Sequence, residues 1–149
     1  MAKVLILEDN LVELYNTAKE LETCNHEVIK ASSTDKADYA LKNLASNSLN
    51  CIIIDLNLSH ELLEDEYKDK TNGGAITGWI WLYFIVRPKL ENSPLIIIYS
   101  EFIEELNDYI KDLATPGEIG FFNTTKRITK AEIVDNPDII INLINNCLK

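Results

Sequence analysis

The chain of 149 residues has few cysteines, no long apolar run and no excess of positive charge, and each shortage excludes a class of protein. Its three cysteines, Cys24, Cys51 and Cys147, are far apart and form no CxxC pair, so neither a zinc site nor a disulfide framework is expected. The longest apolar run, Trp79 to Val86, is far too short to span a bilayer. No signal peptide precedes the first apolar run. We therefore expect a cytoplasmic protein without membrane insertion.

The charge balance narrows the class of partner. The chain carries 24 acidic and 14 basic residues, a net charge of −10, whereas a general nucleic-acid binder needs a basic face for the phosphate backbone. Hydrophobic residues make up 46% and charged residues 26%, which is an ordinary globular composition for a single domain of residues 1–149. We expect no nucleic-acid partner and instead contacts with other proteins or with cations.

Short apolar runs alternate with segments of helical periodicity, which predicts β-α repeats and a parallel sheet. We predict a three-layer α/β sandwich with a five-stranded parallel sheet in the flavodoxin-like order 2-1-3-4-5. The expected strands are 3–7, 26–31, 51–54, 94–99 and 119–122. The expected helices follow a cap at Asn10, follow a cap at Ser33 or Thr34, begin near Thr77, and cover 101–113 and 137–148.

An acidic insertion at about 57–76 interrupts this rhythm, because βα loops usually have two to six residues. A solvated surface loop is the favoured interpretation, and a lid or partner-recognition element is the alternative. The helix that follows, 79–86, is apolar all round, so something must cover its outer face. We expect the insertion to cover it by docking on Trp79 and Tyr83.

Polar side chains gather at the carboxyl ends of the predicted strands, where ligands bind in open α/β sheets. They are Glu8 and Asp9 after the first strand, Asp55 after the third, Ser100 after the fourth and Lys126 after the fifth. Two like charges ~4 Å apart repel by about 4 kcal/mol at an effective dielectric of 20, so three carboxylates require positive charge. Lys126 and a magnesium ion, which prefers oxygen ligands, are the expected sources.

A carboxylate held beside magnesium and a lysine can attack a phosphoryl group, and a short hydroxyl can bind a phosphoryl oxygen. Asp55 and Ser100 are the candidates for these roles. Each residue alone also has an ordinary structural explanation. Asp9 or Asp55 can end a strand or cap a helix, and Ser100 can bind loop backbone. The combination, together with Lys126, favours the functional interpretation.

The chain resembles the response-regulator receiver domains of two-component signalling over nearly its whole length outside the insertion. The matching segments are the opening KVLILEDN at 3–10, IIID at 52–55, PLIIIYS at 94–100, Lys126, and Gly78 at the start of the third helix. Each motif alone is weak, but their order along the strands is specific. The resemblance implies a stand-alone receiver domain, which is not an enzyme beyond its own aspartyl phosphorylation and dephosphorylation.

The resemblance also implies a role for each site residue. Asp55 would be the phosphoacceptor, and Mg²⁺ would be held by Glu8, Asp9, Asp55 and the backbone carbonyl of Asn57. Ser100 and Lys126 would bind the phosphoryl group and signal its arrival. The implied donor is a sensor histidine kinase or a phosphotransfer protein. A downstream protein would read the surface of the fourth helix, fifth strand and fifth helix, and a homodimer stays open.

Three residues depart from the family pattern. Ser59 replaces a usual proline, Glu101 replaces a small residue after the switch hydroxyl, and Arg127 follows the lysine in place of proline. Glu101, Arg127 and the insertion support an alternative, a pseudo-receiver that acts as an interaction module without phosphorylation.

Two enzyme classes on similar sheets fit less well. A nucleophilic-aspartate phosphatase usually has a second aspartate where this chain has Asn57. A flavodoxin needs a phosphate loop after the first strand, where Glu8 and Asp9 would repel a phosphate.

Overall fold

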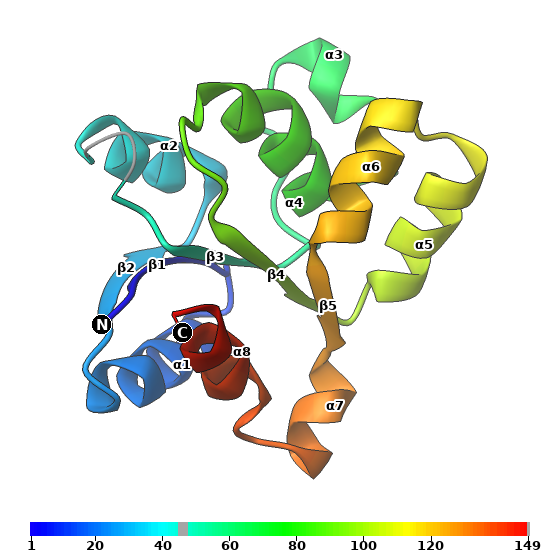
Figure 1. Ribbon diagram of the computed structural model, residues 1–149. Helices are drawn as coiled ribbons and strands as arrows, with labels where there is room; N and C mark the ends of the chain where they lie inside the picture. The colour runs from blue at the N-terminus through cyan, green and yellow to red at the C-terminus, as the bar shows by residue number, and fades with distance from the viewer. Residues whose placement is uncertain (45–47, 149) are drawn as a thin grey trace.

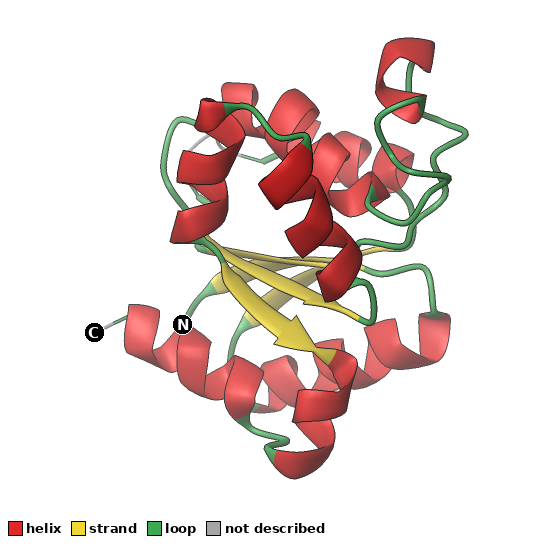
Figure 2. Ribbon diagram, turned by 90° about the vertical axis from the view of Figure 1, so that its right-hand side faces the viewer, coloured by secondary structure: helices red, strands yellow, loops and turns green. Residues whose placement is uncertain are grey.

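The computed structural model describes residues 1–44 and 48–148 and contains a twisted parallel sheet between two layers of helices (Figures 1 and 2). The strands pair in the order β2-β1-β3-β4-β5, which confirms the predicted fold class. In chain order the elements are β1 (Lys3–Leu7), α1 (Leu11–Thr23), β2 (Glu27–Ala31), α2 (Thr34–Lys42), β3 (Cys51–Ile54), α3 (Asp65–Lys68), α4 (Thr77–Ile80) with its π-helical continuation Trp81–Val86 and 3₁₀ turn Arg87–Lys89, β4 (Leu95–Ser100), α5 (Ile103–Asp112), α6 (Pro116–Thr124), β5 (Lys126–Thr129), α7 (Lys130–Asp135) and α8 (Ile139–Cys147).

The central strands are apolar on both faces because helices cover both sides of the sheet. Alternate residues of each strand enter different cores. Ile52 and Ile54 pack with α2, α4 and α5, whereas Cys51 and Ile53 pack with α1 and α8. Figure 1 shows α2, α4, α5 and α6 on one side of the sheet and α1 and α8 on the other. Both cores exclude water from the sheet and leave its carboxyl edge as the place where polar groups collect.

The predicted fifth strand, 119–122, is wrong, because these residues lie within α6. A capping box begins this helix: the Thr115 side chain accepts from the Glu118 N–H, and the Glu118 carboxylate accepts from the Thr115 N–H. Pro116 occupies the first helical position, where its missing N–H costs nothing. The actual fifth strand, β5, begins only at Lys126 and pairs with β4.

The helix α6 also covers the apolar helix that follows the insertion. The ring centroids of Phe121 and Phe122 lie 5.7 and 6.0 Å from that of Trp79. The Trp79 Nε1–H donates to the buried Glu118 carboxylate at 2.9 Å. The expectation that the insertion docks on Trp79 and Tyr83 is therefore wrong, because a helix from the β4–β5 connection occupies that place.

The insertion packs further along the same helix. The Tyr67 ring lies 6.0 Å from that of Phe84, and Leu63 is buried in the same core. Part of the segment is therefore ordered against the domain, which differs from the favoured interpretation of a solvated loop. None of the helices in the described ranges is long and apolar enough to cross a membrane.

Candidate functional site

Three carboxylates meet at the carboxyl edge of the sheet. Leu7 of β1 pairs with Ile54 of β3, so Glu8 and Asp55 leave their strands at the same level. Glu8 is 5% exposed and Asp55 6%, whereas Asp9 is exposed. One carboxylate oxygen from each of the three lies within 4.8 Å of the others. The structure thus brings together the acidic residues that the sequence singled out.

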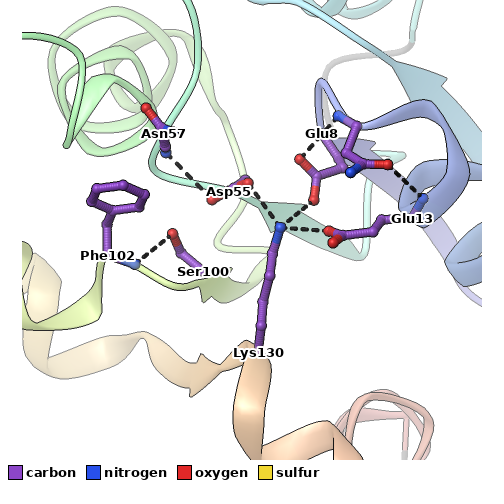
Figure 3. Close-up of polar contacts among 8 residues, drawn as sticks. Glu8, Glu13, Asp55, Asn57, Ser100, Phe102 and Lys130 are labelled. Carbon is purple, nitrogen blue, oxygen red and sulfur yellow. Dashed lines mark hydrogen bonds and ion pairs between the residues drawn. The ribbon is translucent and has the colours of Figure 1, made fainter.

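Lys130 supplies the positive charge of this pocket (Figure 3). It is the first residue of α7, directly after β5. Its Nζ donates to Glu8 Oε1 at 2.8 Å, to Glu13 Oε2 at 2.5 Å and to Asp55 Oδ2 at 3.2 Å. The side chain of Lys130 is 15% exposed, so these ion pairs form in partly desolvated surroundings.

Lys126, which the sequence suggested for this place, lies elsewhere. It is exposed and begins β5, where it pairs with Ile97 in the middle of β4. Lys130 follows four residues later, about 13 Å along an extended strand at 3.3 Å per residue. The error follows directly from the misplaced fifth strand. A second capping box, between Thr129 and Glu132, marks the start of α7 and so could have identified Lys130.

Glu13 is a site residue that sequence reasoning missed. The Asn10 side chain accepts from the Glu13 N–H and caps α1, as predicted, so Glu13 lies in the first turn of that helix. Acidic residues are common there because they offset the helix dipole. Nothing in the sequence distinguishes this ordinary use from the observed contact with Lys130.

The pKa values of Glu8 and Glu13 are shifted in opposite directions. Burial raises the pKa of Glu8 to about 9, and hydrogen bonds with Glu13 and Asp55 add to the rise, while Lys130 opposes it. The pKa of Glu13 is lowered, first by its hydrogen bond from Glu8, so the shared proton resides on Glu8. Burial would lower the pKa of Lys130, but bonds to Glu13 and Glu8 outweigh it and raise the value. Lys130 is therefore a permanent cation here.

Ser100 and Asn57 border the Asp55 carboxylate on the side away from Glu8 (Figure 3). The Asn57 N–H donates to Asp55 Oδ1 at 3.3 Å, which fixes the turn after β3. Ser100 is fully buried at the end of β4, and its Oγ accepts from the Phe102 N–H at 3.1 Å. The Ser100 hydroxyl proton remains available for another acceptor, since this bond uses an oxygen lone pair.

Gly78 lets α4 approach the strand that carries Asp55. A Cβ placed on Gly78 would lie 2.1 Å from the Asp55 carbonyl oxygen and 3.1 Å from the Leu56 Cα. The Gly78 N–H also donates to the Leu56 carbonyl at 3.0 Å. Backbone on both sides forms this contact, so glycine is required for the observed position of Asp55.

One of the sequence departures, Arg127, has a different meaning in the structure. Arg127 does not follow the pocket lysine, because Ala131 follows Lys130. The Arg127 guanidinium donates to the Phe122 and Thr125 carbonyls at 2.7 and 2.9 Å, tying the end of α6 to β5. Glu101 is exposed.

The donor set suits a hard divalent cation. Three carboxylates offer oxygen ligands within reach of one another, and magnesium characteristically takes one or two carboxylates and keeps several waters. Burial and neighbouring acids raise the pKa of Glu8 because they disfavour its anionic form. A bound cation would favour that anionic form. Magnesium therefore fits the residues present.

Comparison with known proteins identifies the fold. No family model matches the chain, and no curated protein matches it. Among solved structures, a response regulator receiver protein from Pseudomonas putida has a TM-score of 0.63 and 16% identity, with 97% of this chain and 96% of that chain covered. RcsB from Salmonella enterica serovar Typhimurium, bound to promoter rprA with phosphomimetic BeF3−, has a TM-score of 0.63 and 17% identity, with full coverage of both. A Francisella response-regulator receiver domain has a TM-score of 0.60 and 16% identity, also with full coverage. The chain has the fold of response-regulator receiver domains.

Proposed function

We propose that the chain is a phosphoacceptor signalling domain of a two-component phosphorelay, with Asp55 as the residue that receives the phosphoryl group. The arrangement of Lys130 beside Glu8 and Asp55, at the carboxyl edge of a receiver-type sheet, is the observation that carries the proposal. The receiver structures named above come from response regulators, which supports a signalling role over a metabolic one.

In the proposed reaction, an Asp55 carboxylate oxygen attacks the phosphorus of a phosphohistidine on a kinase or phosphotransfer protein. The new O–P bond forms as the P–N bond breaks, and the departing imidazole takes up a proton. Lys130 offers its ammonium to the charge on the transferred group, the role that the sequence assigned to Lys126. Ser100 offers its hydroxyl proton to a phosphoryl oxygen and thereby links the pocket to β4.

Glu8, Asp9 and Asp55, with the backbone carbonyl of Asn57, would hold magnesium in this scheme. Magnesium would supply the charge that lets an anionic phosphoryl group approach three acids. Phosphorylation would then shift an existing equilibrium between two arrangements of Ser100 and its surroundings. A partner protein would read the change on the surface that includes α5, β5 and α8, together with α6, which is absent from the predicted elements.

The test is phosphorylation by acetyl phosphate with magnesium, followed by intact-mass measurement. We expect one added phosphoryl group, which Asp55→Asn abolishes. Asp65→Asn, an exposed site in α3, is the control and should leave the modification intact. Absence of modification from acetyl phosphate and from phosphohistidine donors, with no response to beryllofluoride, would instead support the phosphorylation-independent pseudo-receiver.

A further inference from the structure

Glu13 binds the pocket lysine, although the proposed chemistry gives this carboxylate no role. It belongs to α1, whereas the other two partners of Lys130 end β1 and β3 (Figure 3). Its oxygen lies 2.5 Å from the Lys130 Nζ, compared with 3.2 Å for Asp55. The closest partner of Lys130 is thus outside the group of three acids that can hold a metal.

An ammonium group has three N–H donors, and Lys130 directs them to three carboxylates. A phosphoryl group on Asp55 adds acceptors at the place where Lys130 is already fully engaged. The donor that points to Asp55 can pass to a phosphoryl oxygen, but any further bond to the phosphoryl group requires Lys130 to release Glu8 or Glu13. Glu8 is the partner that magnesium would share, and Asp55 carries the phosphoryl group itself. Glu13 remains as the competitor.

We infer that Glu13 is a positioning residue that holds Lys130 in the unphosphorylated state and competes with the phosphoryl group for its ammonium. The inference rests on the proposed phosphoacceptor function. Its consequence is that Glu13 weakens phosphoryl binding: it withdraws the cation and adds a negative charge near an anionic ligand, and both effects act in the same direction. The Glu13 side chain is 34% exposed, so it can turn towards solvent when Lys130 leaves it.

The test compares beryllofluoride binding to the magnesium-loaded protein in Glu13→Gln, Glu13→Ala and the wild type. Glutamine keeps an oxygen acceptor but loses the charge, and alanine loses both. Glu20→Gln is the matched control, because it removes the same charge from the same helix at an exposed position. Beryllofluoride should bind Glu13→Gln roughly tenfold more tightly, about the 1.4 kcal/mol expected for one charge-assisted hydrogen bond. Glu13→Ala should also bind more tightly, and Glu20→Gln should bind as the wild type does.

Two spectroscopic measurements separate positioning from a general effect on folding. The ¹⁹F resonances of bound beryllofluoride should shift in the Glu13 variants as Lys130 moves towards the ligand. In the metal-free protein, the ¹⁵Nζ resonance of Lys130 should change in the same variants and stay constant in Glu20→Gln. Thermal unfolding checks that each variant is folded.

The outcomes distinguish failure of the inference from failure of the proposed phosphoacceptor function. If the wild type binds beryllofluoride and both Glu13 variants bind it equally or less tightly, the competition does not exist and the phosphoacceptor function stands. Equal tightening in Glu20→Gln would also overturn the inference, because net charge would then be the cause. If the wild type neither binds beryllofluoride nor accepts a phosphoryl group, the proposed function fails and the inference fails with it.

Discussion

Lys130 lies 3.2 Å from Asp55 although 75 residues separate them in the chain. The contact joins the C-terminal end of an edge strand, β5, to that of the central strand β3. It also replaces the contact that the sequence suggested for Lys126. The two lysines thus form a natural pair for experiments, since they carry the same charge at opposite ends of one strand.

Replacing Lys130 should abolish or strongly reduce phosphorylation, and replacing Lys126 should not. Lys130→Ala removes the cation that faces Asp55, so we expect the rate with acetyl phosphate to fall by roughly 10²-fold or more, as for other preorganised charge contacts. Lys126→Ala removes an exposed charge about four residues away along the strand. Intact-mass time courses measure both rates. Equal loss in the two variants would show that Lys130 has no special role.

The metal-free protein should lose stability as the pH rises from about 5 to about 9. Glu8 binds its proton more tightly when folded, with a pKa of about 9, than in an unfolded chain, where the ordinary value is 4.5. Its stabilising contribution is thus complete below about 4.5 and is lost as the pH rises through 9. We therefore expect the free energy of unfolding to fall progressively across this window.

Glu8→Gln is the matched variant for this titration, because glutamine stays neutral throughout. Urea unfolding at several pH values should give a flatter profile for Glu8→Gln than for the wild type, with the two proteins most different at high pH. Parallel profiles would mean that Glu8 does not hold its proton in the folded state.

Gly78→Ala should destabilise the protein and displace Asp55, the proposed phosphoacceptor. The new Cβ would overlap the Asp55 carbonyl oxygen at 2.1 Å, so backbone must move. We expect a loss of about 1–3 kcal/mol, as in other overpacked sites. Gly120→Ala is the control: Gly120 lies in α6 with no atom within 4 Å of its added Cβ, so alanine should stabilise that helix slightly. The midpoint of thermal unfolding should fall in Gly78→Ala and rise slightly in Gly120→Ala.

Glu118→Ala should loosen α6 from the domain. The Glu118 carboxylate is 1% exposed and accepts from the Trp79 indole and from the N–H and hydroxyl of Thr115. Its removal leaves a buried indole N–H without this acceptor, at a cost of about 1–3 kcal/mol. We expect lower stability and a red shift of tryptophan emission. Glu104→Ala, an exposed acid on α5, should change neither.

The sequence predicted correctly the central strands, whose continuous apolar runs match their burial on both faces of the sheet. The Ile52–Ile54 run and the matching run in β1 are apolar on both faces, and such runs identify central strands of a parallel sheet. The fifth strand was misplaced because the aromatic pair Phe121–Phe122 imitates a strand. The Thr115–Glu118 capping box opposes that assignment, and it is visible in the sequence.

The acids of the candidate site followed from the strands, since Glu8, Asp9 and Asp55 come directly after β1 and β3. Neither periodicity nor composition predicts that Lys130 lies at the site, because its position depends on where the edge strand ends. The place of Glu13 in the site depends on a side-chain contact between α1 and α7, two helices that are far apart in the chain. Such a contact is set by tertiary packing and leaves no local pattern.

The ion pairs of Lys130 have a consequence for the mobility of the sheet edge. β5 has four residues and lies at the edge of the sheet, where local opening costs least free energy. Opening β5 also moves the Lys130 ammonium away from Glu8 and Asp55. The ion pairs of Lys130 therefore stabilise the closed position of this strand. A divalent cation that takes over the charge of Lys130 relieves that penalty. Hydrogen exchange of the β5 amides should therefore become faster, rather than slower, when a divalent cation binds in the absence of a phosphoryl group.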